Sequence, residues 1–424
     1  MNIRDSEYVM GLLLESGFRI ANSMEKADII LFNSCSVRKH AEDRLISNIA
    51  DLRGLKKKKP GLIIGLIGCT AQSYKEDILK KAPIVDLSCG PGNEGDLPNI
   101  INKVIKDRFP IIAADKVNEK KPELFPKYRE GQFKAYVSIS EGCDNFCSYC
   151  VVPYVRGRER SRDAKDIIKE VTDLAERGFK EATLLGQNVN SYKSSGSVNG
   201  FVKLLEEING IEGIERIRFM TSHPKDASME LFKAMRDLDK VCEHLHLPLQ
   251  SGSNRILKMM NRKYTREKYL ELAEAYRRFV PGGSMTTDII VGFPSESDKD
   301  FKDTYNMMKG IGYDGAFTFK YSPRPPAKSA GLKDDVPKEL KEARLKTLID
   351  FQREVSRMRN APLNGKIVEV LVDGQNERSP GMITGRTRAN KATLFEGDKK
   401  LIGKLVNVKI ESIKPHTLIG RMAG

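Results

Sequence analysis

Apolar runs alternate with amphipathic, charged segments along most of the chain. In the first part, residues 27–33 and 61–68 are continuously apolar, and a polar helical pattern follows each run. Strands that are apolar on both faces are typical of a parallel sheet covered by helices. We therefore expect an N-terminal open parallel α/β sheet domain over residues 1–115. An amphipathic helix opens it, with Asp5 and Ser6 as its predicted N-cap and no strand before it.

The same alternation recurs six times from residue 134 onward. Six apolar segments are separated by helical patterns, at 134–140, 181–187, 216–222, 244–250, 284–293 and 315–321. Six βα units are fewer than a closed eight-stranded barrel needs. The pattern predicts a central partial (β/α)6 barrel over residues 133–358, with its active face at the carboxyl ends of the strands. The charged, proline-containing stretch at 115–132 is expected to be a linker.

The last part of the chain changes character. Residues 361–424 contain short apolar segments split by glycines and polar turns, which predicts a small β-barrel. This segment holds eleven Lys/Arg against six Asp/Glu, and the whole chain has a net charge of +15. Such an excess favours a polyanionic partner, of which nucleic acid is the usual one, over a merely solvated basic surface. No apolar run reaches the ~20 residues of a membrane span, so a cytoplasmic protein is expected.

Seven cysteines add candidate chemistry to this outline. Three of them form a CxxxCxxC loop, Cys143, Cys147 and Cys150, directly after the first strand of the partial barrel. Three thiolates at this spacing can bind three irons of a 4Fe-4S cubane and leave the fourth iron open. The amino and carboxylate groups of S-adenosylmethionine can chelate such an open iron. A zinc site would need a fourth ligand nearby, and the loop contains none.

Two further cysteines follow the two apolar runs of the N-terminal part. Cys35 comes after 27–33, and Cys69 comes after 61–68. Ligands of open α/β sheets lie beyond the carboxyl ends of the strands, so both thiols are expected at a binding edge. Cys89 and Cys242 are expected to be ordinary buried thiols.

Several motifs together resemble the methylthiotransferase branch of the radical-SAM enzymes, over essentially the whole chain. They are NSCSVR (33–38), GCTAQ (68–72), CSYCVVPYVRGRERSR after Asn145, LLGQNVNSY (184–192), TSHPKD (221–226), TDIIVGFPSES (287–297) and YSPRP (321–325). The C-terminal segment resembles a TRAM domain, a small RNA-binding barrel. Within the branch, LLGQNVNSY and CVVPY favour the tRNA-modifying members over those that modify a ribosomal protein.

The resemblance implies two 4Fe-4S clusters and S-adenosylmethionine as cofactors. Cys143, Cys147 and Cys150 would hold the radical-SAM cluster, and Cys35 and Cys69 would hold an auxiliary cluster. The family's third auxiliary ligand would fall two positions upstream of Met1, so in this chain the auxiliary cluster is expected to be weak or missing. The implied reaction adds a methylthio group to C2 of N6-isopentenyladenosine next to the anticodon. One S-adenosylmethionine gives the methyl group and a second gives the radical.

Polar residues at the ends of the predicted strands are candidates for binding S-adenosylmethionine: Gln187, Ser222, Gln250 and Asp288. The alternative is that they make structural hydrogen bonds inside the barrel. Four arginines follow the cysteine loop at every second position and would share one face of an extended segment: Arg156, Arg158, Arg160 and Arg162. They are candidates for tRNA phosphates, or else a solvated basic edge.

The expected partners are the anticodon stem-loop of a tRNA and an electron donor such as flavodoxin or ferredoxin, with the protein a monomer. Three alternatives stay open. The chain could modify threonylcarbamoyl-adenosine in tRNA, or a ribosomal protein. It could also be a non-enzymatic RNA-binding protein whose fold is stabilised by a bound metal ion.

Overall fold

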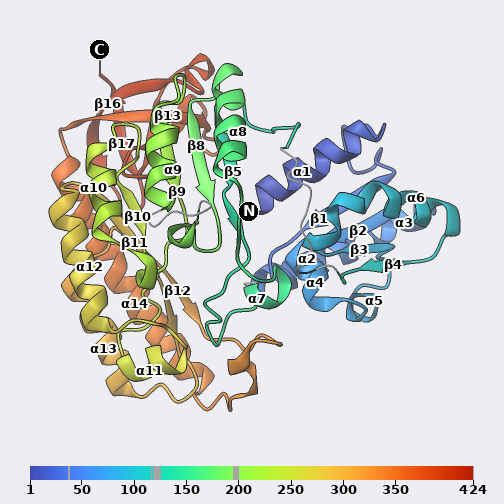
Figure 1. Cartoon of the computed structure of the whole chain (residues 1–424), viewed down its shortest axis with the longest axis horizontal. Coiled ribbons are helices and arrows are strands. Elements are labelled where there is room, and N and C mark those ends of the chain that lie inside the picture. The colour runs from blue at the N-terminus through green and yellow to red at the C-terminus, as the bar shows by residue number, and fades with distance from the viewer. Residues whose placement is uncertain (37–38, 116, 118–125, 194–199, 424) are drawn as a thin grey trace. The chain divides into compact units, whose positions relative to one another are not determined.

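The computed structural model describes residues 1–36, 39–115, 117, 126–193 and 200–423 (Figure 1). Its packing divides the chain into two units. Unit 1 comprises 1–130, 140–162 and 324–327, and unit 2 comprises 131–139, 163–323 and 328–424. The cysteine loop therefore packs with the N-terminal part of the chain, whereas the sequence-based boundaries assigned it to the central barrel. No helix in the described ranges is both long enough and apolar enough to cross a membrane.

Unit 1 is built on a parallel sheet with the strand order β1-β2-β3-β4. Helices α1 and α6 pack on one face of the sheet, and α2 to α5 pack on the other. Because both faces are covered, the middle strand β2 is buried along its whole length. The elements are α1 Asn2–Glu15, β1 Ile29–Asn33, α2 Lys39–Asp51, α3 Arg53–Lys58, β2 Ile63–Ile67, α4 Cys69–Tyr74, α5 Asp77–Lys81, β3 Leu87–Cys89, α6 Leu97–Asp107 and β4 Ile111–Ala113.

The predicted start of the first helix was wrong. Helix α1 begins at Asn2, and Asp5 lies inside the helix with its carboxylate turned to a buried arginine rather than to the helix end. Half of the linker predicted at 115–132 lies outside the described residues. Its last part is ordered, because the Arg129 guanidinium donates to the Glu7 carboxylate over 2.9 Å.

All six strands predicted for the partial barrel are present in unit 2, each followed by its helix on the outside (Figure 1). They form two three-stranded ladders, β5-β8-β9 and β10-β11-β12. A parallel bridge from Ile217 to Val241 connects the two ladders. The elements are β5 Lys134–Ser138, α8 Ala164–Glu176, β8 Glu181–Leu185, α9 Gly200–Asn209, β9 Arg216–Phe219, α10 Met229–Asp237, β10 His244–His246, α11 Asn254–Met259, α12 Arg266–Phe279, β11 Ser284–Val291, α13 Asp298–Ile311, β12 Gly315–Lys320 and α14 Lys338–Asn360.

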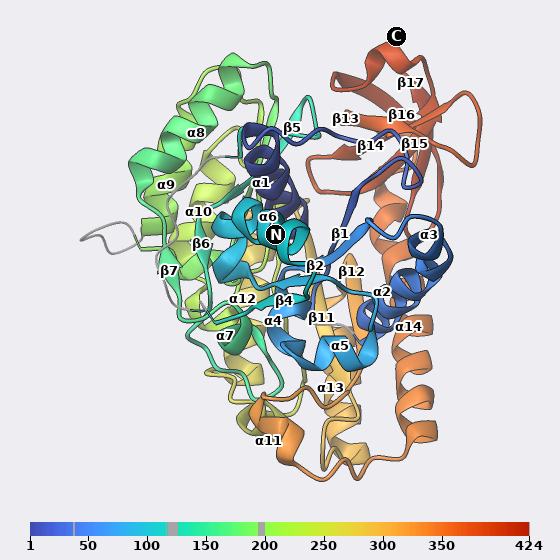
Figure 2. The same cartoon turned by 90° about the vertical axis from the view of Figure 1, so that its right-hand side faces the viewer.

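Helix α14 leads into the predicted C-terminal β-barrel, which is closed in the order β13-β14-β15-β17-β16 (Figure 2). Its core is a ring of buried apolar side chains that includes Val370, Ile383, Phe395 and Ile410. The sequence pattern missed one of its strands, β15. The strands are β13 Ile367–Gln375, β14 Met382–Thr387, β15 Ala392–Glu396, β16 Leu405–Ile413 and β17 Leu418–Met422.

This small barrel docks onto the amino-terminal ends of the central strands. The buried Arg218 of β9 donates to the carbonyl oxygens of Thr387 and Arg388, over 2.7 and 2.8 Å. Ser284, the first residue of β11, donates its hydroxyl to the Ala389 carbonyl over 2.7 Å. The loop between β14 and β15 therefore closes the end of the partial barrel that lies opposite the strand carboxyl ends.

Candidate functional site

The cysteine loop of unit 1 is closed at its base by a short antiparallel pair, β6 (Ser140–Glu141) and β7 (Arg160–Ser161). The Cys143 amide donates to the Gly157 carbonyl over 3.2 Å, just above this pair. Gly142 has φ +79°, and a Cβ at this position would lie 2.1 Å from the Arg158 carbonyl oxygen. Only glycine allows the two ends of the loop to approach this closely.

Within the loop, Cys147 is buried, and Cys143 and Cys150 are half-buried. The Cys150 amide donates to the Cys147 carbonyl over 2.9 Å, which makes a tight turn between these two residues. Burial raises the pKa of the Cys143 thiol to about 11, so without a metal it is a neutral thiol at pH 7. A bound iron would supply the charge that a thiolate ligand needs.

Among the described residues, no three His, Cys, Asp or Glu side chains converge on a point that could hold one metal ion. The loop is compatible with a 4Fe-4S cubane, because each thiolate of such a cluster binds a different iron and the three sulfurs stay apart.

Cys35 and Cys69 lie at the carboxyl edge of the unit 1 sheet, after β1 and β2. The Thr70 amide donates to the Ser34 carbonyl over 3.2 Å and ties the two strand ends together. The two thiols are close enough for the charge of Cys35 to act on Cys69. Burial raises the pKa of Cys69 to about 11, and the neighbouring Arg156 guanidinium opposes this rise.

Two hydroxyl groups next to these cysteines are buried without a hydrogen-bond partner in the described part of the chain, Ser36 Oγ and Thr70 Oγ1. Buried polar atoms of this kind usually have a ligand or water as partner. The edge therefore fits a sulfide-rich cluster, whose sulfurs accept hydrogen bonds. Cys242 lies in unit 2. Cys89 ends the neighbouring strand β3 at the same edge, where its carbonyl accepts from the Gly68 amide over 3.0 Å. Both thiols are buried, as ordinary thiols would be.

Arg156, which was expected to face tRNA, is buried and only 6% exposed. Its Nη2 donates to Asp5 Oδ2 over 2.5 Å, and its Nε donates to Cys69 Sγ over 3.1 Å. Burial opposes the charge of this guanidinium, but Asp5 and then Cys69 raise its pKa above the ordinary value. The expectation that Arg156 contacts phosphate was therefore wrong, because its side chain points into the protein.

The other three arginines do not share one face with Arg156. Arg158 is exposed and pairs with Asp144 over 2.6 Å. Arg160 and Arg162 are half-buried. The segment is not extended throughout, because Arg156 ends the turn of α7 (Val152–Val155) and Gly157 has φ +79°, and only Arg160 and Ser161 form a strand.

In unit 2, three of the four candidates for binding S-adenosylmethionine lie just beyond the carboxyl ends of strands, and the fourth lies inside a strand. Gln187 follows β8, Ser222 follows β9, Gln250 follows β10, and Asp288 lies within β11. The Gln250 amide donates to the Asp288 carbonyl over 2.8 Å. Gln187 Oε1 and Ser222 Oγ are buried without a hydrogen-bond partner in the described ranges, which favours a ligand over structural hydrogen bonds.

The same edge contains polar groups that the sequence pattern did not single out. Within the described residues, both amide atoms of Asn190 and Nε2 of His223 are buried and unpaired. Thr221 has φ +70° and Gln250 has φ +68°, a region that residues other than glycine rarely adopt, β-branched ones such as Thr221 least of all. Backbone strain of this kind concentrates at functional sites. A sequence signal existed, because these residues belong to the LLGQNVNSY and TSHPKD motifs.

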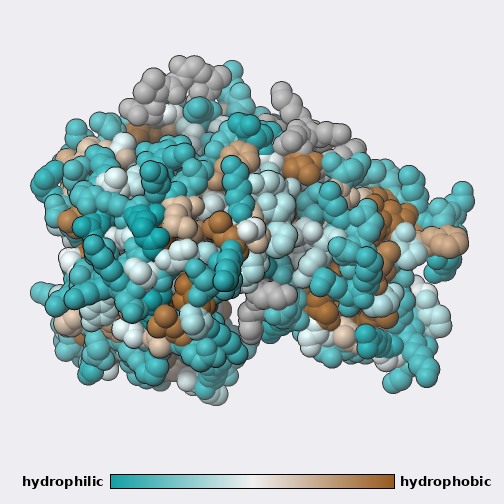
Figure 3. All heavy atoms as spheres, turned by 90° about the horizontal axis from the view of Figure 1, so that it is seen from below, coloured by the Kyte–Doolittle hydropathy of each residue, from teal (hydrophilic) through white to brown (hydrophobic). Residues whose placement is uncertain are grey.

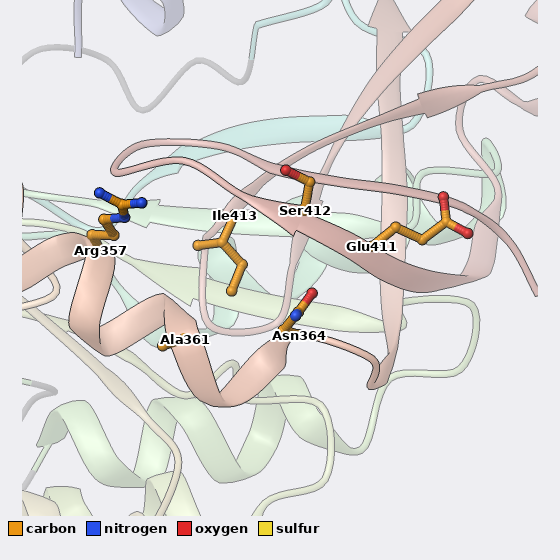
Figure 4. A pocket seen from close by; sticks show the side chains of 6 residues that line it. All are labelled: Arg357, Ala361, Asn364, Glu411, Ser412 and Ile413. Carbon is orange, nitrogen blue, oxygen red and sulfur yellow. The ribbon is translucent and has the colours of Figure 1, made fainter.

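A hollow of about 300 Å³ lies where α14 meets β16 (Figure 4). It is lined by Arg357, Asn364 and Glu411, among others, and by no cysteine or histidine. Figure 3 shows one face of the molecule on which hydrophilic residues predominate and hydrophobic ones form small separate patches. The hollow therefore does not offer the chemistry found at the strand ends.

Comparisons with known proteins agree with this arrangement. Three family models match the chain: "Uncharacterized protein family UPF0004" over residues 1–90, "Radical SAM superfamily" over 137–308 and "TRAM domain" over 363–423. They cover the unit 1 sheet, the cysteine loop with most of the partial barrel, and the C-terminal barrel.

Relatives named tRNA-2-methylthio-N(6)-dimethylallyladenosine synthase match along the full length. The protein of Thermoanaerobacter sp. (strain X514) is 48% identical, over 100% of this chain and 90% of the relative. That of Syntrophomonas wolfei is 46% identical, over 100% of this chain and 95% of the relative. The chain belongs to the radical-SAM methylthiotransferase family. As a member of this family it is an enzyme, and the family implies 4Fe-4S clusters and S-adenosylmethionine as cofactors.

The radical-SAM methyltransferase TsrM from Kitasatospora setae has a similar fold, with a TM-score of 0.58. The match covers 78% of this methylthiotransferase chain and 72% of TsrM, at 12% sequence identity. At this identity the likeness concerns the fold alone, and it agrees with an α/β sheet combined with a partial barrel.

Proposed function

We propose that this enzyme adds a methylthio group to C2 of N6-isopentenyladenosine next to the anticodon of tRNA. The observation that carries the proposal is that both sets of cysteines belong to one compact unit, in which the cysteine loop packs against Cys69. Radical formation and sulfur insertion must act on the same carbon, so their two sites have to be neighbours. The names of the full-length relatives support this substrate.

Each group of residues has a distinct role. Cys143, Cys147 and Cys150 hold the radical-SAM cluster, and Cys35 and Cys69 hold the auxiliary cluster. When bound, the clusters and S-adenosylmethionine supply the one-electron, methyl-transfer and sulfur-transfer chemistry. The chain positions the cofactor, with its binding groups at the strand ends of unit 2: Gln187, Ser222, Gln250 and Asp288. Ser222 and Gln250 are buried, and their burial keeps bulk water from the reactive centre.

The C-terminal barrel binds the tRNA through its phosphates. Its solvent-facing basic residues are Lys366, Arg378, Arg386, Lys399, Lys400, Lys404, Lys409, Lys414 and Arg421. Basic groups of this kind bind RNA mainly by shape and charge. Arg158, Arg160 and Arg162 remain candidates for contacts closer to the modified base. The enzyme acts as a cytoplasmic monomer and takes its electrons from a flavodoxin or ferredoxin.

The test is an anaerobic assay with an anticodon stem-loop RNA that contains N6-isopentenyladenosine. We expect the reconstituted wild type to form 5′-deoxyadenosine, and to form the 2-methylthio nucleoside in proportion to the auxiliary iron that it binds, both detected by mass spectrometry. Cys150→Ala should form neither product. Cys242→Ala is the matched control, because this buried thiol lies in unit 2 outside both sets, and it should retain both products.

Three results would redirect the proposal. Product only from RNA carrying threonylcarbamoyl-adenosine would assign the related tRNA reaction. Product only from a ribosomal protein would assign the protein-modifying reaction. Zinc in place of iron, with no 5′-deoxyadenosine, would indicate a non-enzymatic RNA-binding protein.

A further inference from the structure

Arg156 connects the cysteine loop to the sheet edge that holds Cys69. It follows Cys150 by six residues, and the single turn of α7 lies between them. The Arg156 amide donates to the Val152 carbonyl over 2.8 Å and closes this turn. Val151 and Val155 pack against Cys69 in a small buried cluster, so the turn and the sheet edge form one packed surface.

The guanidinium of Arg156 divides its donors among different partners. Nη2 bonds to Asp5 and Nε bonds to Cys69 Sγ. Nη1 is buried and has no acceptor among the residues that the structure describes. A guanidinium that serves only an ion pair usually presents two parallel donors to one carboxylate. Here Nη2 and Nε donate to two different acceptors, and the acceptor of Nε is a sulfur that the proposed function assigns to the auxiliary cluster.

Other polar atoms near Cys69 also lack hydrogen-bond partners among the described residues. Ser36 Oγ and Thr70 Oγ1, next to the two auxiliary cysteines, are buried and unpaired in the described ranges. Asp5 is fully buried and accepts from Nη2, the donor next to the Nε that bonds to the sulfur. Together these atoms form a buried polar environment whose unused donors have no acceptor among the residues that the structure describes. Cluster sulfides and thiolate sulfurs are acceptors of this kind.

We infer that Arg156 is a positioning residue of the auxiliary cluster: it donates hydrogen bonds to the cluster side of Cys69 and ties that site to the radical-SAM loop. The inference rests on the proposed function, because that proposal supplies the auxiliary cluster. Hydrogen bonds to cluster sulfurs stabilise the reduced, more negative state and raise its reduction potential.

The test uses the full-length chain with Cys143, Cys147 and Cys150 all replaced by Ala, so that the auxiliary cluster alone remains after anaerobic reconstitution with iron and sulfide. Three further substitutions are compared in this parent: Arg156→Gln, Arg156→Lys and, as matched control, Arg53→Gln. Arg53 is an exposed arginine of the same unit. The readouts are iron per chain, the EPR spectrum of the reduced cluster and its midpoint potential.

We expect Arg156→Gln to hold at least twofold less iron than the parent and to shift the potential of the remaining cluster to more negative values. Arg156→Lys keeps the charge but loses the split fork, so it should give intermediate values. Arg53→Gln should match the parent. If Arg156→Gln fails to fold, as judged by circular dichroism, Arg156→Lys carries the test with the same readouts.

Equal iron, spectrum and potential in the parent and the folded Arg156 variants would overturn the inference. If the wild type still formed the 2-methylthio nucleoside, the proposed function would stand without it. A parent that binds no iron would remove the auxiliary cluster from the proposal and this inference with it. Loss of product in the wild-type RNA assay is a separate result, which concerns the proposed function.

Discussion

Replacing Arg218 with Met should separate the C-terminal barrel from the central strands. The Arg218 side chain is 8% exposed and pairs with Glu181 Oε2 over 2.8 Å. It also donates to the Thr387 and Arg388 carbonyls of the docked loop. Met fills similar space but supplies none of these donors, and it leaves the Glu181 carboxylate, which is also buried, without its cationic partner.

Breaking a buried ion pair by removing one partner costs about 3–5 kcal/mol. For a domain of 150–250 residues, each kcal/mol lowers the melting temperature by roughly 2–4 °C. Unit 2 is somewhat larger than that, which reduces the shift per kcal/mol, so we expect a fall of roughly 6–10 °C, measured by circular dichroism. Limited proteolysis between α14 and β13 should also become faster, because the barrel is no longer held at its docking site.

The matched control is Arg353→Met, which removes an exposed arginine of α14 in the same unit. Changes at exposed sites are usually within about 0.5 kcal/mol, so its melting temperature should stay close to that of the wild type. If Arg218→Met melted like the control and was cleaved no faster, the bonds to the docked loop would not be what holds the barrel in place.

Two other perturbations test the cysteine loop and the barrel interior. Gly142→Ala would place a Cβ 2.1 Å from the Arg158 carbonyl oxygen and should abolish iron binding by the loop. Gly178→Ala is the control, because Gly178 has a similar φ of +87° but open space around it. It should cost about 1–2 kcal/mol of stability and leave iron binding unchanged. Burial lowers the pKa of His244 to about 3. The unfolded chain therefore binds a proton at this histidine near pH ~6.5, whereas the folded chain binds it only near pH 3. As the pH falls from ~6.5 toward 3, the free energy of unfolding decreases by up to about 1.4 kcal/mol per pH unit. Urea unfolding between pH 7 and pH 5 should show a shallower loss for His244→Asn.

Equal iron contents in the two glycine variants would show that the close approach at Gly142 is not needed for the loop. An unchanged pH slope in His244→Asn would place the acid sensitivity elsewhere. His223 is the first alternative, because burial lowers its pKa as well, to about 2.

The sequence predicted the strands well where both faces are buried, since continuous apolar runs have no other common explanation. It missed β15, whose five residues Ala392–Glu396 alternate between half-buried and buried positions and resemble a turn-flanked loop. It also missed the three-residue strands β3 and β4, which are too short to show a period. Local pattern carries little information about elements of this size.

In the candidate site, too, the local features could be predicted from the sequence and the long-range ones could not. The spacing of Cys143, Cys147 and Cys150 is local, so the sequence alone could single out the loop. The burial of Arg156 could not be predicted, because its partner Asp5 is 151 positions away. An every-second-residue argument holds only for extended backbone, and the turn of α7 removes that condition here. Long-range pairing of charges becomes visible only when the sheet and the loop are placed together.

The docking of the C-terminal barrel fixes the distance between the barrel and the candidate cofactor site within unit 2. The barrel closes the amino-terminal end of the strands, whereas Gln187, Ser222 and Gln250 lie at the opposite end. The longest strand between the two ends, β11, has eight residues and therefore spans about 25 Å. An isolated nucleoside reaches only one end of this span. Substrates should therefore be sorted by length as well as by base, with short RNA fragments losing affinity before they lose reactivity.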